Sequence, residues 1–100
     1  MSEKYKSYIL SENADADIDA IFDYTESEHG FNQAVKYLSD LESVFQKLII
    51  SPEIGRKRDE VKTGLYSLPE QQHIVFYRIL KNHIRIVRVL YGSKDIPKNF

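Results

Sequence analysis

The stretch that decides the fold is His73-Ile74-Val75-Phe76-Tyr77-Arg78-Ile79-Leu80, then Lys81-Asn82-His83, then Ile84-Arg85-Ile86-Val87-Arg88-Val89-Leu90-Tyr91. Two runs rich in β-branched and aromatic residues flank a short polar break, which predicts a β-hairpin. A strand with one face in water alternates apolar and polar side chains, and these strands do not alternate cleanly. Both faces of the hairpin therefore need cover, and the second face is a candidate surface for a partner.

The residues before the hairpin predict one strand and two helices. The segment Tyr5 to Leu10 is short, aromatic and apolar at its end, as is typical of a strand. A helix is expected between N-cap residues in Ser11-Glu12-Asn13 and a terminating Gly30. Apolar residues then recur at three- and four-residue steps from Phe31 to Ile49, which predicts an amphipathic helix that ends before Pro52. The short link between the two helices indicates an antiparallel helical hairpin.

The remaining elements complete a small α+β domain. Residues 51–63 form a polar loop that contains the basic triplet Arg56-Lys57-Arg58, and Gly64 to Pro69 is a short strand. The expected order is β-α-α-β-β-β in one domain, residues 1–100, with an antiparallel sheet and the helical hairpin packed on one face. Two helices cover only one face, so the other, apolar and basic, face is expected to be open.

Charge is unevenly placed along the chain. The formal net charge is −1, yet residues 1–55 contain four Lys and Arg against eleven Asp and Glu, whereas residues 56–100 contain ten against four. This asymmetry points either to an acidic partner for the basic half or to two halves that complement each other across the fold. The sequence leaves both open.

Several classes of function are disfavoured by composition. There is no cysteine, so neither a disulfide framework nor cysteine-ligated zinc is expected. The N-terminus lacks the apolar run of a signal peptide, and no apolar stretch approaches the ~20 residues that span a membrane. Asp15, Asp19 and Asp23 share a helical face, which we interpret as solvated because metal binding needs denser ligands. We expect no metal, no cofactor, no membrane and a cytoplasmic location.

Short motifs in a fixed order carry a family resemblance. They are Asp23-Tyr24, Gln33-Ala34, Tyr37-Leu38, Pro52-Glu53-Ile54-Gly55-Arg56, Gly64-Leu65-Tyr66-Ser67, His73 to Arg78, Ile84 to Gly92, and Asp95-Ile96. Together they resemble the RelE/ParE superfamily of toxins, and the last strand is similar to the ParE branch, where it commonly ends in Arg-Val-Leu-His-Gly. Tyr91 stands where that pattern has histidine and so departs from it.

The resemblance implies the toxin of a bacterial type II toxin–antitoxin module. A ParE-like toxin inhibits DNA gyrase and blocks replication without chemistry of its own, and a small ParD-like antitoxin neutralises it by folding onto it. Under this hypothesis direct sequence-specific nucleic-acid binding is not expected. The predicted partner-binding residues are Arg56, Arg58, Arg78, Arg85, Arg88 and Tyr91. Strand alternation predicts that Arg85 and Arg88 serve different faces.

The alternative is a RelE-like, ribosome-dependent mRNA endoribonuclease. Such an enzyme needs a group to move a proton and cations to hold the phosphorane. The candidates are Arg56, Lys57, Arg58, His73, Arg78, His83 and Tyr91. Tyr91 and Arg78 are the predicted catalytic pair, with a histidine as the alternative to Tyr91 for moving the proton. Neither histidine lies beside an obvious carboxylate in the sequence. A third possibility is a degenerate member that binds only its antitoxin.

Overall fold

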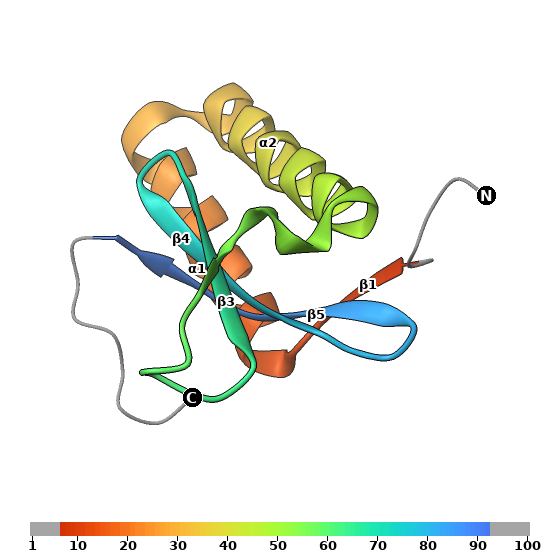
Figure 1. Ribbon diagram of the computed structural model, residues 1–100. Helices are drawn as coiled ribbons and strands as arrows, with labels where there is room; N and C mark the ends of the chain where they lie inside the picture. Colours follow the sequence, from red (N-terminus) through yellow and green to blue (C-terminus); the bar gives the residue numbers. More distant parts are fainter. Residues whose placement is uncertain (1–6, 93–100) are drawn as a thin grey trace.

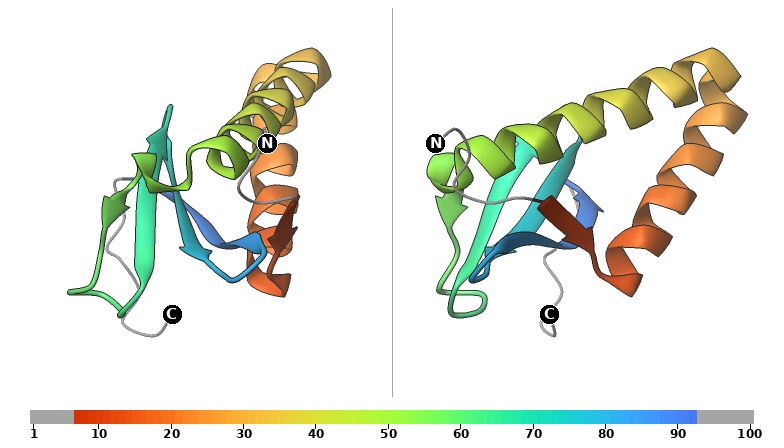
Figure 2. Two further views of the ribbon diagram at one scale, coloured as in Figure 1. Left: turned by 45° about the vertical axis from the view of Figure 1, so that its right-hand side comes forward. Right: turned by 90° about the vertical axis from the view of Figure 1, so that its right-hand side faces the viewer.

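The computed structural model describes residues 7–92, which form two helices on one side of a five-stranded sheet (Figures 1 and 2). The expected strand start at Tyr5 and the tail from residue 93 lie outside the described residues. The elements are β1 (Ser7–Leu10), α1 (Glu12–His29), α2 (Phe31–Ile50), the 3-10 helix η1 (Pro52–Ile54), β2 (Arg56–Lys57), β3 (Leu65–Glu70), β4 (His73–Ile79) and β5 (His83–Tyr91).

The helical hairpin begins and turns where the sequence predicts. The Ser11 hydroxyl accepts a hydrogen bond from the Ala14 amide at 2.9 Å and caps α1. Gly30 has a φ of 93°, a conformation that favours glycine, and it separates α1 from α2. The second helix ends at Ile50, just before Pro52. The predicted antiparallel pair of helices is confirmed.

The sheet has the order β1-β5-β4-β3-β2. The α+β class and the predicted β-α-α-β-β-β order are confirmed, with two additions. The first strand pairs parallel with the last, so the sheet is mixed rather than wholly antiparallel. A two-residue strand, Arg56–Lys57, adds to the edge of β3 from within the segment that was predicted to be a loop.

The main core lies between the helical hairpin and the sheet. Figure 2 shows both helices on one side of the sheet. Alanine and aliphatic residues of α1 and an apolar row of α2 pack there on side chains from β4 and β5. The buried members are Ala14, Ile18, Tyr37, Leu41, Val44, Phe45, Leu48, Ile49, Val75, Tyr77, Ile84, Ile86 and Val89. At the η1 end of this core, the Tyr77 hydroxyl donates to the Pro52 carbonyl at 2.6 Å and accepts from the Gly55 amide at 3.0 Å.

The far face of the sheet is less open than predicted. Leu65 and Phe76 are each only 1% exposed, although neither belongs to the core under the helices. The Arg58 guanidinium lies over the Phe76 ring at 6.0 Å and donates to the Ser67 hydroxyl at 3.2 Å. The prediction of an open face is therefore wrong at this position, because the loop folds back and covers part of it.

A β-bulge changes which side chains share a face. Phe76 lies opposite Arg88 and Tyr77 lies opposite Ile86, so Val87 is an extra residue in β5. An extra residue reverses the alternation of the strand beyond it. Arg88 therefore shares a face with Arg85 and with Arg78, which lies opposite Arg85. The prediction that Arg85 and Arg88 serve different faces is wrong.

Among residues 7–92, no helix is long and apolar enough to cross a membrane.

Candidate functional site

Three arginines meet at a pocket on the far face of the sheet. The pocket has a volume of about 230 Å³ and lies between β4, β5, the start of α1 and the loop before β3. Its lining residues are Ser11, Asn13, Lys62, Leu65, Arg78, Arg85, Val87 and Arg88. We call it the arginine pocket. Sequence alternation did not predict this gathering, because the bulge at Val87 produces it.

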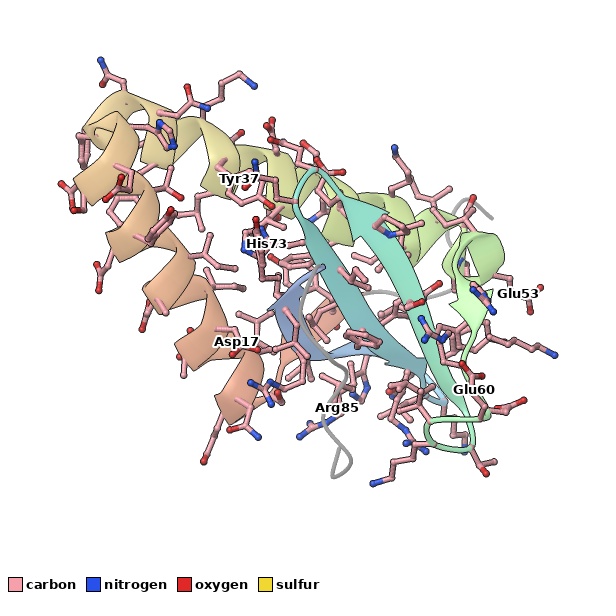
Figure 3. All side chains as sticks on the ribbon, turned by 90° about the vertical axis from the view of Figure 1, so that its left-hand side faces the viewer. Asp17, Tyr37, Glu53, Glu60, His73 and Arg85 are labelled. Carbon is pink, nitrogen blue, oxygen red and sulfur yellow. The ribbon has the colours of Figure 1, made fainter. Side chains whose placement is uncertain are left out.

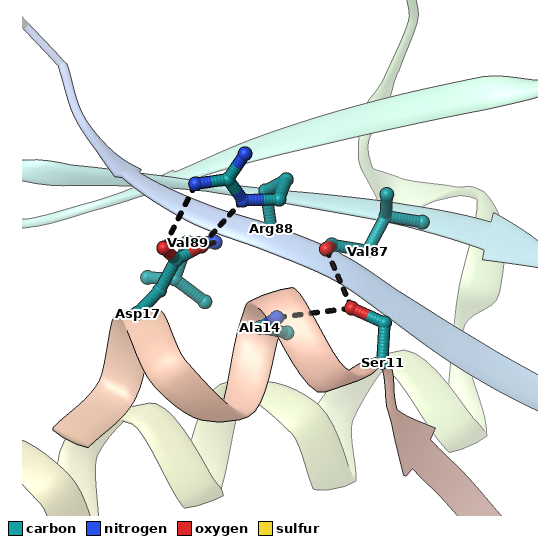
Figure 4. A network of polar contacts seen from close by, with 6 residues as sticks. All are labelled: Ser11, Ala14, Asp17, Val87, Arg88 and Val89. Carbon is teal, nitrogen blue, oxygen red and sulfur yellow. Dashed lines mark hydrogen bonds and ion pairs between the residues drawn. The ribbon is translucent and has the colours of Figure 1, made fainter. Parts of the chain in front are cut away.

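Arg88 anchors one wall of the arginine pocket through a carboxylate of α1. Its Nε and Nη2 donate to the two Asp17 oxygens at 2.8 and 2.9 Å, and the Val89 amide donates to the same carboxylate at 3.0 Å (Figure 4). The hydrogen bonds that Arg88 donates to Asp17 raise the pKa of Arg88. Nearby, the Ser11 hydroxyl donates to the Val87 carbonyl at 2.8 Å, so α1 is held to β5 at two points.

Arg78 and Arg85 form the second part of the pocket. They lie directly opposite each other on β4 and β5. Within residues 7–92, neither guanidinium has a carboxylate partner. Arg78 is half-buried, and its Nη2 lies 3.3 Å from where a Cβ at position 64 would be, so Gly64 leaves room for it. Arg85 is exposed.

Two side chains of the basic triplet are exposed, and the third makes contacts within the protein. Arg56 and Lys57 are exposed on the edge strand β2. Arg58 is mostly covered, and its Nε donates to a Glu60 oxygen at 2.8 Å. Hydrogen bonding to Arg58 lowers the pKa of Glu60. The partner-binding role predicted for Arg56 and Arg58 stays a prediction.

An aromatic cluster occupies the opposite end of the β4–β5 hairpin. The His73 ring lies 5.4 Å from the Tyr37 ring and 5.7 Å, edge to face, from the Tyr91 ring. The Tyr37 hydroxyl is 2.6 Å from His73 Nδ1 and donates to the Glu70 carbonyl at 3.1 Å. Burial lowers the pKa of His73, and the negative charge of Asp17 raises it by a smaller amount. Burial also raises the pKa of Tyr37 to about 12.

Tyr91 and Arg78, the catalytic pair of the nuclease hypothesis, lie apart. Tyr91 is on the helix side of the sheet with His73, whereas Arg78 lines the pocket on the far face. His73 and Arg78 are five positions apart on β4, which is roughly 16 Å along a strand. In Figure 3, His73 lies beside Tyr37 and Arg85 lies toward the other end of the sheet. These residues do not converge on one phosphate.

The other sequence candidates are solvent-facing. His83 begins β5 and its Nδ1 is 3.1 Å from the Asn82 side chain. Asp15, Asp19 and Asp23 are exposed on α1. Among the described residues, no group of three or more His, Asp or Glu side chains is arranged to hold a metal ion.

A second hollow runs along the helix side, where sequence reasoning named no site. This apolar groove has a volume of about 400 Å³ and is lined by Tyr8, Leu10, Ile18, Val35, Leu38, Ser39, Leu41, Glu42 and Phe45. Val35 and Leu38 are 44% and 40% exposed. The Tyr8 hydroxyl donates to the Glu42 carboxylate at its rim. The available signal was a second apolar stripe on α2, with Phe31, Val35 and Leu38 beside the core stripe.

Sequence reasoning also missed Asp17. It lies three residues after Ala14 and four before Ile21, on the helix face that packs on the sheet. A carboxylate on an apolar helix face signals a buried partner, because an unpaired buried charge is costly. Asp17 was therefore identifiable as paired, but its partner Arg88 was not.

Comparisons with known proteins agree with this architecture. Residues 8–96 match a family model described as the ParE toxin of the type II toxin-antitoxin system, parDE. The chain is 36% identical over 93 residues to Toxin ParE1 of Mycobacterium tuberculosis (strain CDC 1551 / Oshkosh), covering 92% of this chain and 95% of that protein. It is 33% identical over 90 residues to Toxin ParE1 of Caulobacter vibrioides, covering 90% and 93%.

A solved structure shares the fold. A chain of the chromosomal ParDE TA system from P. aeruginosa superposes with a TM-score of 0.74, covers 87% of this chain and 95% of its own, and is 22% identical. At that identity the likeness concerns the fold alone. The family match over residues 8–96 and the two ParE1 relatives carry the assignment: the chain belongs to the ParE toxin family of type II toxin–antitoxin systems.

Proposed function

We propose that this chain is a cytoplasmic toxin that binds DNA gyrase, blocks replication without catalysing a reaction, and is neutralised by a ParD-like antitoxin. One observation favours binding over RNA cleavage. Tyr91 and Arg78 lie on opposite faces of the sheet and near opposite ends of the β4–β5 hairpin. A general acid or base and the cation that stabilises the phosphorane must reach the same phosphate.

The apolar groove on α2 suits the antitoxin. Val35 and Leu38 expose apolar surface next to the partly buried Tyr8 and Leu10 of β1. A polypeptide segment that is disordered when free gains most from burying apolar anchors as it folds. A helix or strand of the antitoxin that places two or three apolar side chains in this groove satisfies that requirement.

A supercoiling assay tests the proposal. Purified chain, added to DNA gyrase, ATP and relaxed plasmid, is expected to block supercoiling and to leave cleaved-DNA complexes. The control is the same reaction with the chain first bound to the antitoxin encoded beside it, which is expected to supercoil normally. Normal supercoiling at a saturating concentration of the free chain would contradict the proposal.

A ribosome assay run in parallel tests the nuclease alternative. If the chain cuts mRNA on ribosomes and both Tyr91→Phe and Arg78→Ala abolish the cutting, the alternative is correct and the proposal is wrong. If neither assay responds and expression leaves growth unchanged, the chain is a member that binds its antitoxin only.

A further inference from the structure

We infer that the arginine pocket is a binding site for one carboxylate, supplied by a glutamate or aspartate side chain of a partner polypeptide. The inference rests on the proposed function only for the partner, which is then the antitoxin. The site itself is assigned from Arg78, Arg85, Arg88 and the shape of the cavity.

The charge of the pocket is unbalanced. Like charges directly opposite each other on neighbouring strands destabilise a sheet, and Arg78 and Arg85 are such a pair. Arg88 has its carboxylate in Asp17, but residues 7–92 supply none for the other two. An anion between Arg78 and Arg85 converts this repulsion into two charge-assisted interactions.

The bulge provides independent support. Bulges occur often beside functional sites, where they re-aim side chains. Here the extra residue Val87 brings Arg85 and Arg88 to one face, whereas regular alternation would place them on opposite faces. The Val87 carbonyl is fixed by the Ser11 hydroxyl at 2.8 Å, so the bulge is held in place from α1.

The walls of the pocket favour a carboxylate on an aliphatic stem. Leu65 and Val87 supply apolar lining beside the guanidinium groups, and the volume of about 230 Å³ accommodates one side chain. Glutamate and aspartate combine methylene groups with a planar carboxylate that accepts two parallel hydrogen bonds from arginine.

A nucleic-acid backbone fits the surroundings less well. The helix that begins beside the pocket carries Glu12 and Asp15 in its first turn. A strand of phosphates presents several negative charges in a row, which these carboxylates repel. A single anionic side chain contacts the arginines without placing further negative charges beside these carboxylates.

NMR of the arginine Nε–Hε groups tests the site on the intact chain. The probes are acetyl-Ala-Glu-Ala-amide, the matched glutamine peptide, and dimethyl phosphate as a phosphodiester. The glutamate peptide is expected to shift the Arg78 and Arg85 signals saturably and to leave Arg56, which is exposed outside the pocket, unchanged. The glutamine peptide is expected to shift none of them.

Variants make the assignment specific. Arg85→Gln is expected to weaken binding at Arg78 at least about tenfold, because one charge-assisted pair is lost. Arg78→Gln is the second variant and reports through Arg85, whereas the control Arg56→Gln is expected to keep wild-type affinity. Circular dichroism checks that each variant is folded.

Three results would overturn the inference. They are no saturable shift at Arg78 and Arg85, an equal shift at Arg56, and binding of dimethyl phosphate at least ten times tighter than the glutamate peptide, which would assign the pocket to nucleic acid. None of these measurements uses gyrase or antitoxin. A pocket that binds the peptide on a chain that leaves supercoiling untouched would therefore reject the proposed function alone.

Discussion

The ion pair between Asp17 and Arg88 makes a sharp prediction about stability. Asp17→Ala removes three hydrogen bonds at once, those donated to the carboxylate by Arg88 Nε, by Arg88 Nη2 and by the Val89 amide. It leaves a guanidinium that is only 25% exposed without its anion. The carboxylate itself is 15% exposed, so water replaces little of what is lost.

The magnitude follows from this burial. Breaking a buried pair costs about 3–5 kcal/mol and an exposed pair about 0–1 kcal/mol, so this intermediate pair is expected to cost about 2 kcal/mol. The unpaired Val89 amide adds about 1 kcal/mol. For a domain of this size, a total of about 3 kcal/mol lowers the melting temperature by roughly 12–24 °C.

Urea unfolding measures the loss of unfolding free energy. Asp19→Ala, which changes an exposed carboxylate on the same helix, is the matched control and is expected to cost less than about 0.5 kcal/mol. Asp17→Asn keeps an acceptor for the Val89 amide, so its loss of unfolding free energy is expected to lie between those of Asp17→Ala and Asp19→Ala. A cost below about 1 kcal/mol for Asp17→Ala would refute the view that this pair holds α1 to β5.

Three other perturbations follow from the structure. Tyr77→Phe loses the buried hydroxyl that joins Pro52 and Gly55 and is expected to cost about 1–3 kcal/mol in urea unfolding; a cost near zero would mean that the loop is held by other contacts. Burial lowers the pKa of His73, so the folded state takes up its proton less readily than the unfolded state. The contribution of neutral His73 to the free energy of unfolding is fully present above the unfolded pKa of about 6.5 and is lost as pH falls toward the folded pKa. Between pH 7.5 and pH 5 the melting temperature should therefore fall less in His73→Gln than in the wild type, and parallel curves would contradict this. Leu38→Asp places a charge in the apolar groove and is expected to weaken antitoxin binding at least about tenfold by calorimetry with little loss of stability, since Leu38 is 40% exposed; unchanged affinity would move the antitoxin elsewhere.

The elements with strong local signals were predictable from the sequence. The apolar row of α2, the Ser11 cap and the Gly30 break fix the helical hairpin through contacts within a few residues. The β4–β5 hairpin was predictable because its two runs are adjacent in the chain. These features depend on local propensity and periodicity, which the sequence displays directly.

Features that depend on distant partners were not predictable. The parallel pairing of β1 with β5 joins segments more than seventy residues apart, and no local pattern encodes it. The bulge at Val87 is one extra residue in an apolar strand, so it leaves no mark in the periodicity. The arginine pocket depends on that bulge, which is why strand alternation placed Arg85 and Arg88 on opposite faces.

The position of β5 has a consequence for how the molecule assembles. This strand is synthesised last among the described elements, yet it lies between β1 and β4 and must pair with both. Contacts between segments far apart in sequence form slowly, because the intervening chain must first be ordered. The β3–β4 and β4–β5 pairs are local hairpins, whereas β1 and Asp17 meet β5 across more than seventy residues. We expect a nascent or refolding chain to hold its helical hairpin and the β3–β4–β5 pairs before β1 and α1 dock on β5, with Asp17 unpaired and the arginine pocket incomplete. Pulse-labelling hydrogen exchange would reveal this as protection of the β1 amides after those of β3 and β4, and simultaneous protection of β1 and β4 would contradict it. A polypeptide assembled in this order completes the arginine pocket only at the final step of folding.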